Sequence, residues 1–251
     1  MKKTIPPVKE LYQQVSKNVL NPNTSFTSEL WYSRIFGRKV SIYFTWVFLK
    51  LGINEPNHVT LISLIPALFG SAFLAIPSIW NTIVGFLIFN LYIFIDSSDG
   101  EIARYTNKKS EFGRYLDGIL HIFIYAGLYI ALGANIYLRN FDSLWLLLGI
   151  FTAFLFTAAS FIHHTYPLQK KKSYFELRKK DSALIYYGIN VYNFLTGDLE
   201  IFLFLFLFAP LQYLGIIELD LFKIILLLNA FLILFGGILY NVYKKFKENQ
   251  K

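Results

Sequence analysis

Three aspartates stand in places where acidic side chains are costly. Asp96 and Asp99 come at the end of one long apolar run, and Asp117 comes at the start of the next. Ionisable groups in such runs are expensive to keep, so they point to a functional site. A separation of three residues places the carboxylates of Asp96 and Asp99 on one face of a helix. We therefore predict that these two side chains act together.

A second helix face carries a matching set of residues. Gly113, Asp117 and His121 are spaced four apart, which aligns them along one side of a helix. The polar connection over residues 105–112 is short, so the two faces are expected to meet. Three carboxylates brought together repel one another unless a cation lies between them, and clustered oxygen ligands suit Mg²⁺ or Mn²⁺. The spacing therefore predicts a metal site.

Neighbouring residues suit a ligand that carries phosphate. Arg104 offers a forked donor for phosphate oxygens, and Gly100 and Gly113 leave room for a close approach of backbone or ligand. A simpler interpretation is that the aspartates only cap or flank helix ends, where a negative charge is favourable near the N-terminus. That interpretation explains any one aspartate about as well as a site does, but it does not explain the whole set at this spacing.

The elements that must position these residues are membrane-spanning helices. The chain has 251 residues, of which 55% are hydrophobic and 19% aromatic, more apolar side chain than a soluble domain of this length buries. About twenty apolar residues cross a hydrocarbon core of roughly 30 Å. Six runs of about that length are present, over residues 57–77, 79–95, 116–138, 144–162, 199–217 and 222–242. The absence of cysteine excludes disulfides, thiolate metal sites and cysteine nucleophiles.

The basic residues set the orientation of these spans. With six spans, all of the 24 Lys and Arg except Arg139 and Lys223 fall on one side of the membrane. Basic residues accumulate on the cytoplasmic side, so both termini and the acidic site are expected to be cytoplasmic. The net charge of +8 is explained by this distribution, and we expect no nucleic acid partner.

The predicted fold is all-α, a polytopic membrane protein of six transmembrane helices with an N-terminal interfacial helix. Residues 1–55 mix aromatic and basic side chains, a composition typical of an amphipathic cytosolic or interfacial segment in the headgroup layer. A short, partly buried helix packed beneath the bundle fits the same residues. Residues 56–243 form the expected six-span domain, and residues 244–251 a basic cytosolic tail.

These residues resemble the signature of the CDP-alcohol phosphatidyltransferase family, D-x2-D-G-x2-A-R-x8-G-x3-D-x3-D. Seven of its eight positions match, with every gap correct: Asp96, Asp99, Gly100, Ala103, Arg104, Gly113 and Asp117. His121 stands where the last aspartate belongs. The likeness extends to the six-span layout and to Asn57 and Thr60 at the opening of the first span, and covers roughly residues 40–242.

The resemblance implies an enzyme that moves a substituted phosphate from a CDP-linked alcohol to a hydroxyl acceptor with release of CMP, in phospholipid or related glycan and lipid biosynthesis. Divalent metal, Mg²⁺ or Mn²⁺, would stabilise the attacking and leaving oxygens. Family members are commonly homodimers. The implied metal ligands are Asp96, Asp99 and Asp117. The residues implied to bind the donor are Asp96, Asp99, Gly100, Ala103, Arg104, Gly113, Asn57 and Thr60.

The departure at position 121 leaves three interpretations open. His121 acts with Asp117 in catalysis as the base for the acceptor hydroxyl, or it ligates the metal and shifts preference toward Mn²⁺ or Zn²⁺. In the third, activity is impaired and the chain acts as a membrane protein that binds nucleotide or lipid. Glu101 offers a replacement carboxylate, although a glutamate at this position is more often a solvated interface residue.

Overall fold

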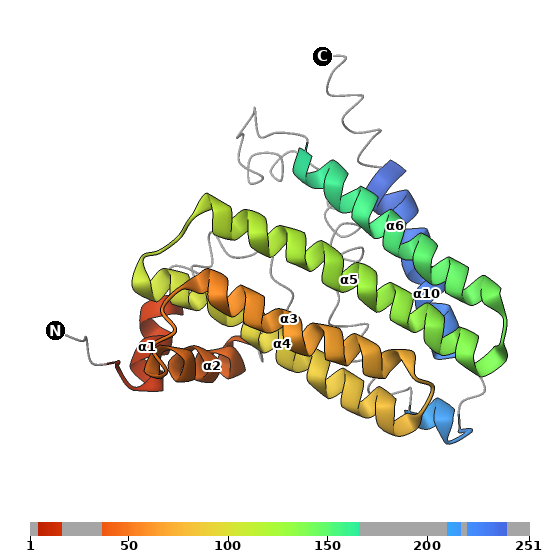
Figure 1. Ribbon diagram of the computed structural model, residues 1–251, viewed down its shortest axis with the longest axis horizontal. Coiled ribbons are helices and arrows are strands. Elements are labelled where there is room, and N and C mark those ends of the chain that lie inside the picture. Colours follow the sequence, from red (N-terminus) through yellow and green to blue (C-terminus); the bar gives the residue numbers. More distant parts are fainter. Residues whose placement is uncertain (1–4, 17–36, 166–209, 217–219, 240–251) are drawn as a thin grey trace, which may run out of the picture. The chain divides into compact units, whose positions relative to one another are not determined.

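The computed structural model describes residues 5–16, 37–165, 210–216 and 220–239 (Figure 1). In this part of the chain every named element is a helix, as an all-α fold predicts. The elements are α1 (Val8–Ser16), α2 (Arg38–Lys50), α3 (Pro56–Ala75), α4 (Ile79–Thr106), α5 (Glu111–Asn140), α6 (Ser143–Thr165), α10 (Leu221–Leu232) and the π-helical η2 (Ile233–Leu239).

Four of the helices are long and apolar enough to cross a membrane, namely α3, α4, α5 and the part of α6 up to Phe161. They correspond to the first four predicted spans. A shorter apolar helical stretch, Leu221–Gly236, coincides with the start of the sixth. Most of the fifth predicted span, 199–217, lies outside the described residues, as does the end of the sixth, so the count of six remains a prediction.

Helix α4 is longer than the predicted second span. The apolar run ends at residue 95, yet the helix continues to Thr106, so Asp96 and Asp99 lie inside a helix and not at its end. Only residues 107–110 separate α4 from α5. Asn107 takes a left-handed backbone conformation with φ 58°, which asparagine tolerates well. Ser110 caps α5, because its Oγ accepts a hydrogen bond of 2.9 Å from the Gly113 N–H.

The chain divides into two compact units. Unit 1 is Met1–Ala72 with Val84–Ile124, and unit 2 is Phe73–Ile83 with Tyr125–Lys251. Every residue that the sequence assigned to the site falls in unit 1.

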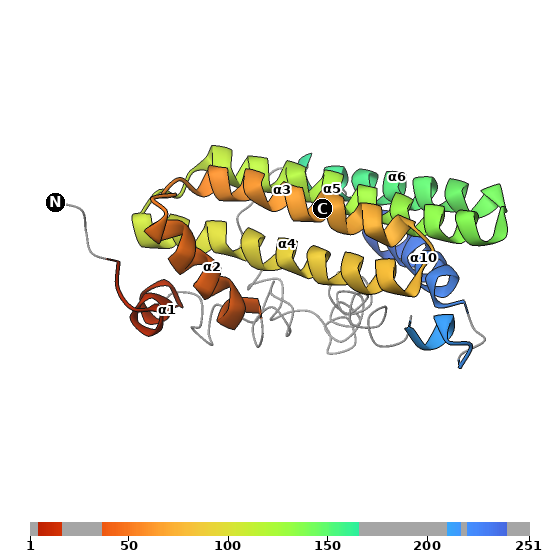
Figure 2. The ribbon, with the colours of Figure 1, turned by 60° about the horizontal axis from the view of Figure 1, so that its bottom comes forward.

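In unit 1, α1 and α2 pack on the start of α3 and the C-terminal part of α4. Figure 1 and Figure 2 both show α1 and α2 beside these ends of α3 and α4. The shared core consists of Leu11, Val15, Ile42, Leu49, Val59, Ile95 and Ile102. Further along, a Cβ added to Gly70 would lie 2.8 Å from the backbone nitrogen of Phe89. The backbones of α3 and α4 therefore touch at a glycine, a packing mode common between membrane helices.

In unit 2, the second half of α5 meets α6 through a pair of glycines. A Cβ on Gly133 would lie 2.7 Å from the carbonyl oxygen of Trp145, so neither helix has room for a side chain at this crossing. Helix α6 also packs on α10 and η2. Asp220, the N-cap of α10, lies 3.0 Å from Arg139 and 3.8 Å from Lys223. These are the two basic residues that the sequence separated from all the others.

Candidate active site

The two helix faces predicted from the sequence do meet in unit 1. Asp96 on α4 and Asp117 and His121 on α5 each offer one ligand atom, and these atoms all lie within 4.8 Å of one another. All three side chains are half-buried. The short connection between α4 and α5 produces this arrangement, because it turns the chain back within four residues.

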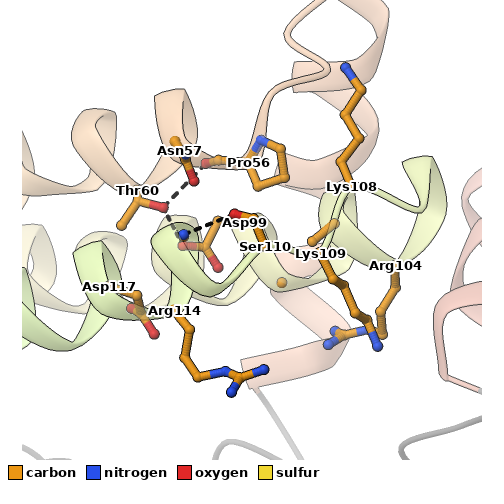
Figure 3. A pocket seen from close by; sticks show the side chains of 13 residues that line it. Pro56, Asn57, Thr60, Asp99, Arg104, Lys108, Lys109, Ser110, Arg114 and Asp117 are labelled. Carbon is orange, nitrogen blue, oxygen red and sulfur yellow. Dashed lines mark hydrogen bonds between the residues drawn. The ribbon is translucent and has the colours of Figure 1, made fainter.

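Asp99 lies beside this group and is held from α3. The hydroxyl of Thr60 lies 2.5 Å from Oδ2 of Asp99 and donates a hydrogen bond to it (Figure 3). Thr60 is 3% exposed, so the contact is shielded from solvent. Helix α3 thus fixes the rotamer of Asp99, while Asp96 faces Asp117 and His121.

A cavity of about 220 Å³ opens next to Asp99 and Asp117 (Figure 3). The predicted residues that line it are Asn57, Thr60, Asp99, Gly100, Ala103, Arg104, Gly113 and Asp117. Lys108, Lys109 and Arg114 line it as well. These three residues were not predicted as site residues, although they lie between or beside the matched positions. The cavity therefore joins acidic and basic side chains, an arrangement suited to phosphate groups.

The absence of a side chain at Gly113 allows α3 to approach the start of α5. A Cβ at Gly113 would lie 2.9 Å from Oδ1 of Asn57 and 3.0 Å from Oγ of Ser110. At Gly100 the nearest atom to an added Cβ is the guanidinium of Arg104 at 3.3 Å, the end of a flexible side chain. Both glycines therefore face the ends of side chains, and the approach is closer at Gly113 than at Gly100.

A second cavity of about 150 Å³ shares Asp99, Gly100, Arg104 and Asp117 with the first. Its other lining residues are Arg38, Asp96, Ser97 and Glu101. Arg38 comes from α2 and is 7% exposed. No sequence spacing connects Arg38 with the aspartates, so sequence reasoning missed it.

The expectation that Glu101 is solvated is wrong. Glu101 is 2% exposed and accepts hydrogen bonds of 2.7 Å from Ser41 and 2.6 Å from Thr45. The reason is that α2 covers this side of α4. Glu101 is therefore committed to hydroxyl partners on α2 and does not replace the aspartate missing at position 121.

His121 has a buried neighbour on α4. The hydroxyl of Tyr92 lies 3.2 Å from Nδ1 of His121, and the same nitrogen lies 3.9 Å from Oδ1 of Asp117. Tyr92 is fully buried. Sequence analysis missed Tyr92, although its position four residues before Asp96 places it on the same helix face. The contact with Tyr92 holds the imidazole ring beside the carboxylates.

The donor set fits a divalent cation. The ligand atoms of Asp96, Asp117 and His121 lie within 4.8 Å of one another, and two carboxylates this close repel each other unless a positive charge lies between them. Oxygen-rich sets suit Mg²⁺ and Mn²⁺, and one imidazole nitrogen is also compatible with Mn²⁺.

The helices and this site define a class of protein: an integral membrane protein with a carboxylate and imidazole cluster beside cavities lined by both acidic and basic side chains. Residues 53–235 match the CDP-alcohol phosphatidyltransferase family. The chain therefore belongs to that family. Its members use divalent metal.

Two curated relatives are similar over shorter stretches. An uncharacterised protein of Aquifex aeolicus is 40% identical over 81 residues, which cover 32% of this chain and 40% of the relative. A bifunctional IPC transferase and DIPP synthase of Archaeoglobus fulgidus is 29% identical over 116 residues, or 46% of this chain and 22% of the relative. The matched stretches thus span less than half of either relative.

Proposed function

We propose that this chain transfers a substituted phosphate from a CDP-linked alcohol to a hydroxyl acceptor and releases CMP. The observation that carries the proposal is the convergence of Asp96, Asp117 and His121 beside a cavity lined by basic side chains. A diphosphate substrate needs carboxylates that hold a cation and basic side chains that hold its phosphate oxygens. The archaeal relative is named as a transferase and a synthase, which supports transfer chemistry.

In this proposal Asp96, Asp99 and Asp117 would hold Mg²⁺ or Mn²⁺, with Asp99 lying beside the group that Asp96 and Asp117 form with His121. Such a cation would supply charge neutralisation to the diphosphate and to the entering and leaving oxygens. Arg104 and Lys109 hold phosphate oxygens, whereas Lys108 is paired with Glu55. Asn57 and Thr60 bring the start of α3 to the nucleotide, and Gly100, Ala103 and Gly113 keep the cavity open to it.

His121 is the proposed base. The acceptor hydroxyl gives its proton to the imidazole, and its oxygen forms a bond to the phosphorus distal to cytidine. The bond between this phosphorus and the bridging oxygen of CMP breaks. The electron pair leaves with CMP. The support for this role is the contact of His121 with Tyr92 beside Asp117, since an imidazole held by a buried hydroxyl is oriented before the acceptor arrives.

We also propose that the site faces the cytoplasm, in line with the distribution of Lys and Arg in the sequence, and that the chain forms a homodimer, as the family resemblance implies. The donor in the family is CDP-diacylglycerol or a CDP-linked small alcohol.

The test is CMP release by the purified full-length protein from a panel of CDP-linked donors, each paired with hydroxyl acceptors. We expect release with Mg²⁺ or Mn²⁺ and none after chelation with EDTA. Asp96→Asn and Asp117→Asn should each lower the rate at least 100-fold. Asp142→Asn is the matched control, because Asp142 is exposed and caps α6 through Leu144, a role that asparagine fills equally well.

Two outcomes would contradict the proposal. Asp117→Asn with unchanged CMP release would exclude Asp117 from the metal site. Tight binding of CMP with no turnover on any donor would favour the alternative, a catalytically impaired family member that binds nucleotide or lipid.

A further inference from the structure

Buried polar contacts attach helix α2 to the site helix α4. Ser41 and Thr45 lie one helical turn apart on α2, both fully buried, and each donates to a different oxygen of Glu101. Oγ of Ser98 on α4 lies 3.0 Å from the carbonyl oxygen of Ser41. Hydrogen bonds are directional and apolar contacts are not. These contacts therefore attach α2 to α4 and also fix the rotation of α2 about its own axis.

The rotation of α2 decides where Arg38 lies. Arg38 precedes Ser41 by three residues and so shares its helix face, and it is almost completely buried. Its side chain lines the second cavity together with Asp96, Asp99 and Arg104. Burying an arginine is costly unless charged or polar groups meet it. The cavity that receives it also borders the carboxylates at which the reaction is proposed.

We propose that Arg38 binds a phosphate oxyanion of a substrate in the second cavity, and that Glu101 is a positioning residue that holds Arg38 there through Ser41 and Thr45. The planar guanidinium can give two parallel hydrogen bonds to one phosphate. The ligand assignment rests on the proposed function, in which the donor carries a diphosphate and the acceptor carries a hydroxyl and, in some cases, a phosphate. Either the donor or a phosphorylated acceptor can therefore present a phosphate oxyanion to Arg38.

The first experiment measures binding by calorimetry on the full-length protein in detergent, with CMP and glycerol 3-phosphate as probes. Arg38→Gln should weaken one of the two probes about tenfold or more, and Arg38→Lys should recover part of the loss. Lys39→Gln is the control, because Lys39 is the next residue and is exposed; it should change neither probe. Weaker CMP binding assigns the cavity to the donor, and weaker glycerol 3-phosphate binding assigns it to the acceptor.

The second experiment tests the positioning role. Glu101→Gln and Thr45→Val should each weaken the probe that depends on Arg38, and Thr45→Ser, which keeps the hydroxyl, should restore binding. In a double-mutant cycle, Glu101→Gln should add little to the loss already caused by Arg38→Gln, because both act on the same contact. A merely structural role for Glu101 would instead give additive losses and overturn the positioning claim.

The results separate this inference from the proposed function. The phosphate site is overturned if wild-type protein binds neither probe, or if Arg38→Gln binds both as wild type does, even when CMP release is normal. If no CDP-linked donor yields CMP while probe binding still depends on Arg38, the proposed function fails and the phosphate site stands.

Discussion

The hydroxyl of Tyr92 lies 3.2 Å from Nδ1 of His121, although 29 residues separate the two along the chain. Tyr92 is on α4, one turn before Asp96, and His121 is on α5, one turn after Asp117. The substituted position of the family signature therefore has its own buried partner, and the imidazole on α5 is oriented from α4.

Replacing Tyr92 with phenylalanine removes the hydroxyl that contacts His121 and leaves the size of the side chain almost unchanged. We expect kcat for CMP release to fall about three- to tenfold, the equivalent of one ordinary hydrogen bond, with KM for the donor unchanged. Steady-state kinetics measure both constants. Tyr43→Phe serves as the control, because Tyr43 is 60% exposed. An increase in KM without a change in kcat would show that Tyr92 contributes to binding and not to the orientation of His121.

Substitutions at His121 separate a base from a ligand. For a base, His121→Ala should lower kcat by about 10²- to 10⁴-fold and leave CMP binding intact. His121→Asp restores the residue of the family signature. We expect its kcat to remain below that of wild type, because the Tyr92 hydroxyl beside position 121 is placed to contact an imidazole nitrogen. Activity of His121→Asp at or above wild type, together with an altered preference between Mg²⁺ and Mn²⁺, would assign His121 to metal binding.

The hydrogen bond from Thr60 to Asp99 gives a third prediction. Thr60→Val keeps the shape of the side chain but leaves a shielded carboxylate oxygen without its donor, at a cost of about 1–3 kcal/mol. We expect a lower melting temperature in detergent and a higher Mg²⁺ concentration for half-maximal CMP release. Thr60→Ser keeps the hydroxyl and should behave like wild type. Unchanged melting and metal dependence in Thr60→Val would show that this contact does not hold Asp99.

Gly113 provides a steric test with a control on the same helix. An alanine Cβ would lie 2.9 Å from Oδ1 of Asn57, so in Gly113→Ala either the Asn57 side chain turns away from the cavity or α3 shifts from the start of α5. We expect a loss of about 1–3 kcal/mol of stability, as in other overpacked sites, and a marked loss of CMP release. At Gly127, also on α5, an added Cβ meets nothing within 4 Å. Gly127→Ala should therefore leave activity unchanged. Equal activity of the two variants would contradict the close approach at Gly113.

Much of the fold was predictable because hydrophobic length and helical spacing are local properties. The first four apolar runs correspond to α3, α4, α5 and α6. The interval of four residues places Asp117 and His121 together beside Asp96, a group that does not include Asp99. The bounds of α4 and α5 were less accurate. Apolar runs report where lipid contact ends, whereas a helix continues as long as its backbone hydrogen bonds and its packing permit.

The polar surroundings of the site were harder to predict. Glu101 appeared solvated in the sequence because it follows an apolar run, but α2 covers it. Ser41 and Thr45 gave no signal of their own, since isolated hydroxyl residues in an amphipathic helix usually face water or the headgroups. Arg38 lay among other basic residues near the N-terminus, where charge alone did not distinguish it.

The sequence by itself determined the class of fold, the acidic and basic residues of the signature and the substitution at position 121, because each depends on residue type and on spacing within one helix or one short turn. Only the tertiary structure decided which partners those residues have: Thr60 for Asp99, Tyr92 for His121, and α2 for Glu101. The physical reason is that contacts between distant segments depend on how helices rotate and cross, which follows from the packing of many side chains together and leaves no periodic mark in the sequence.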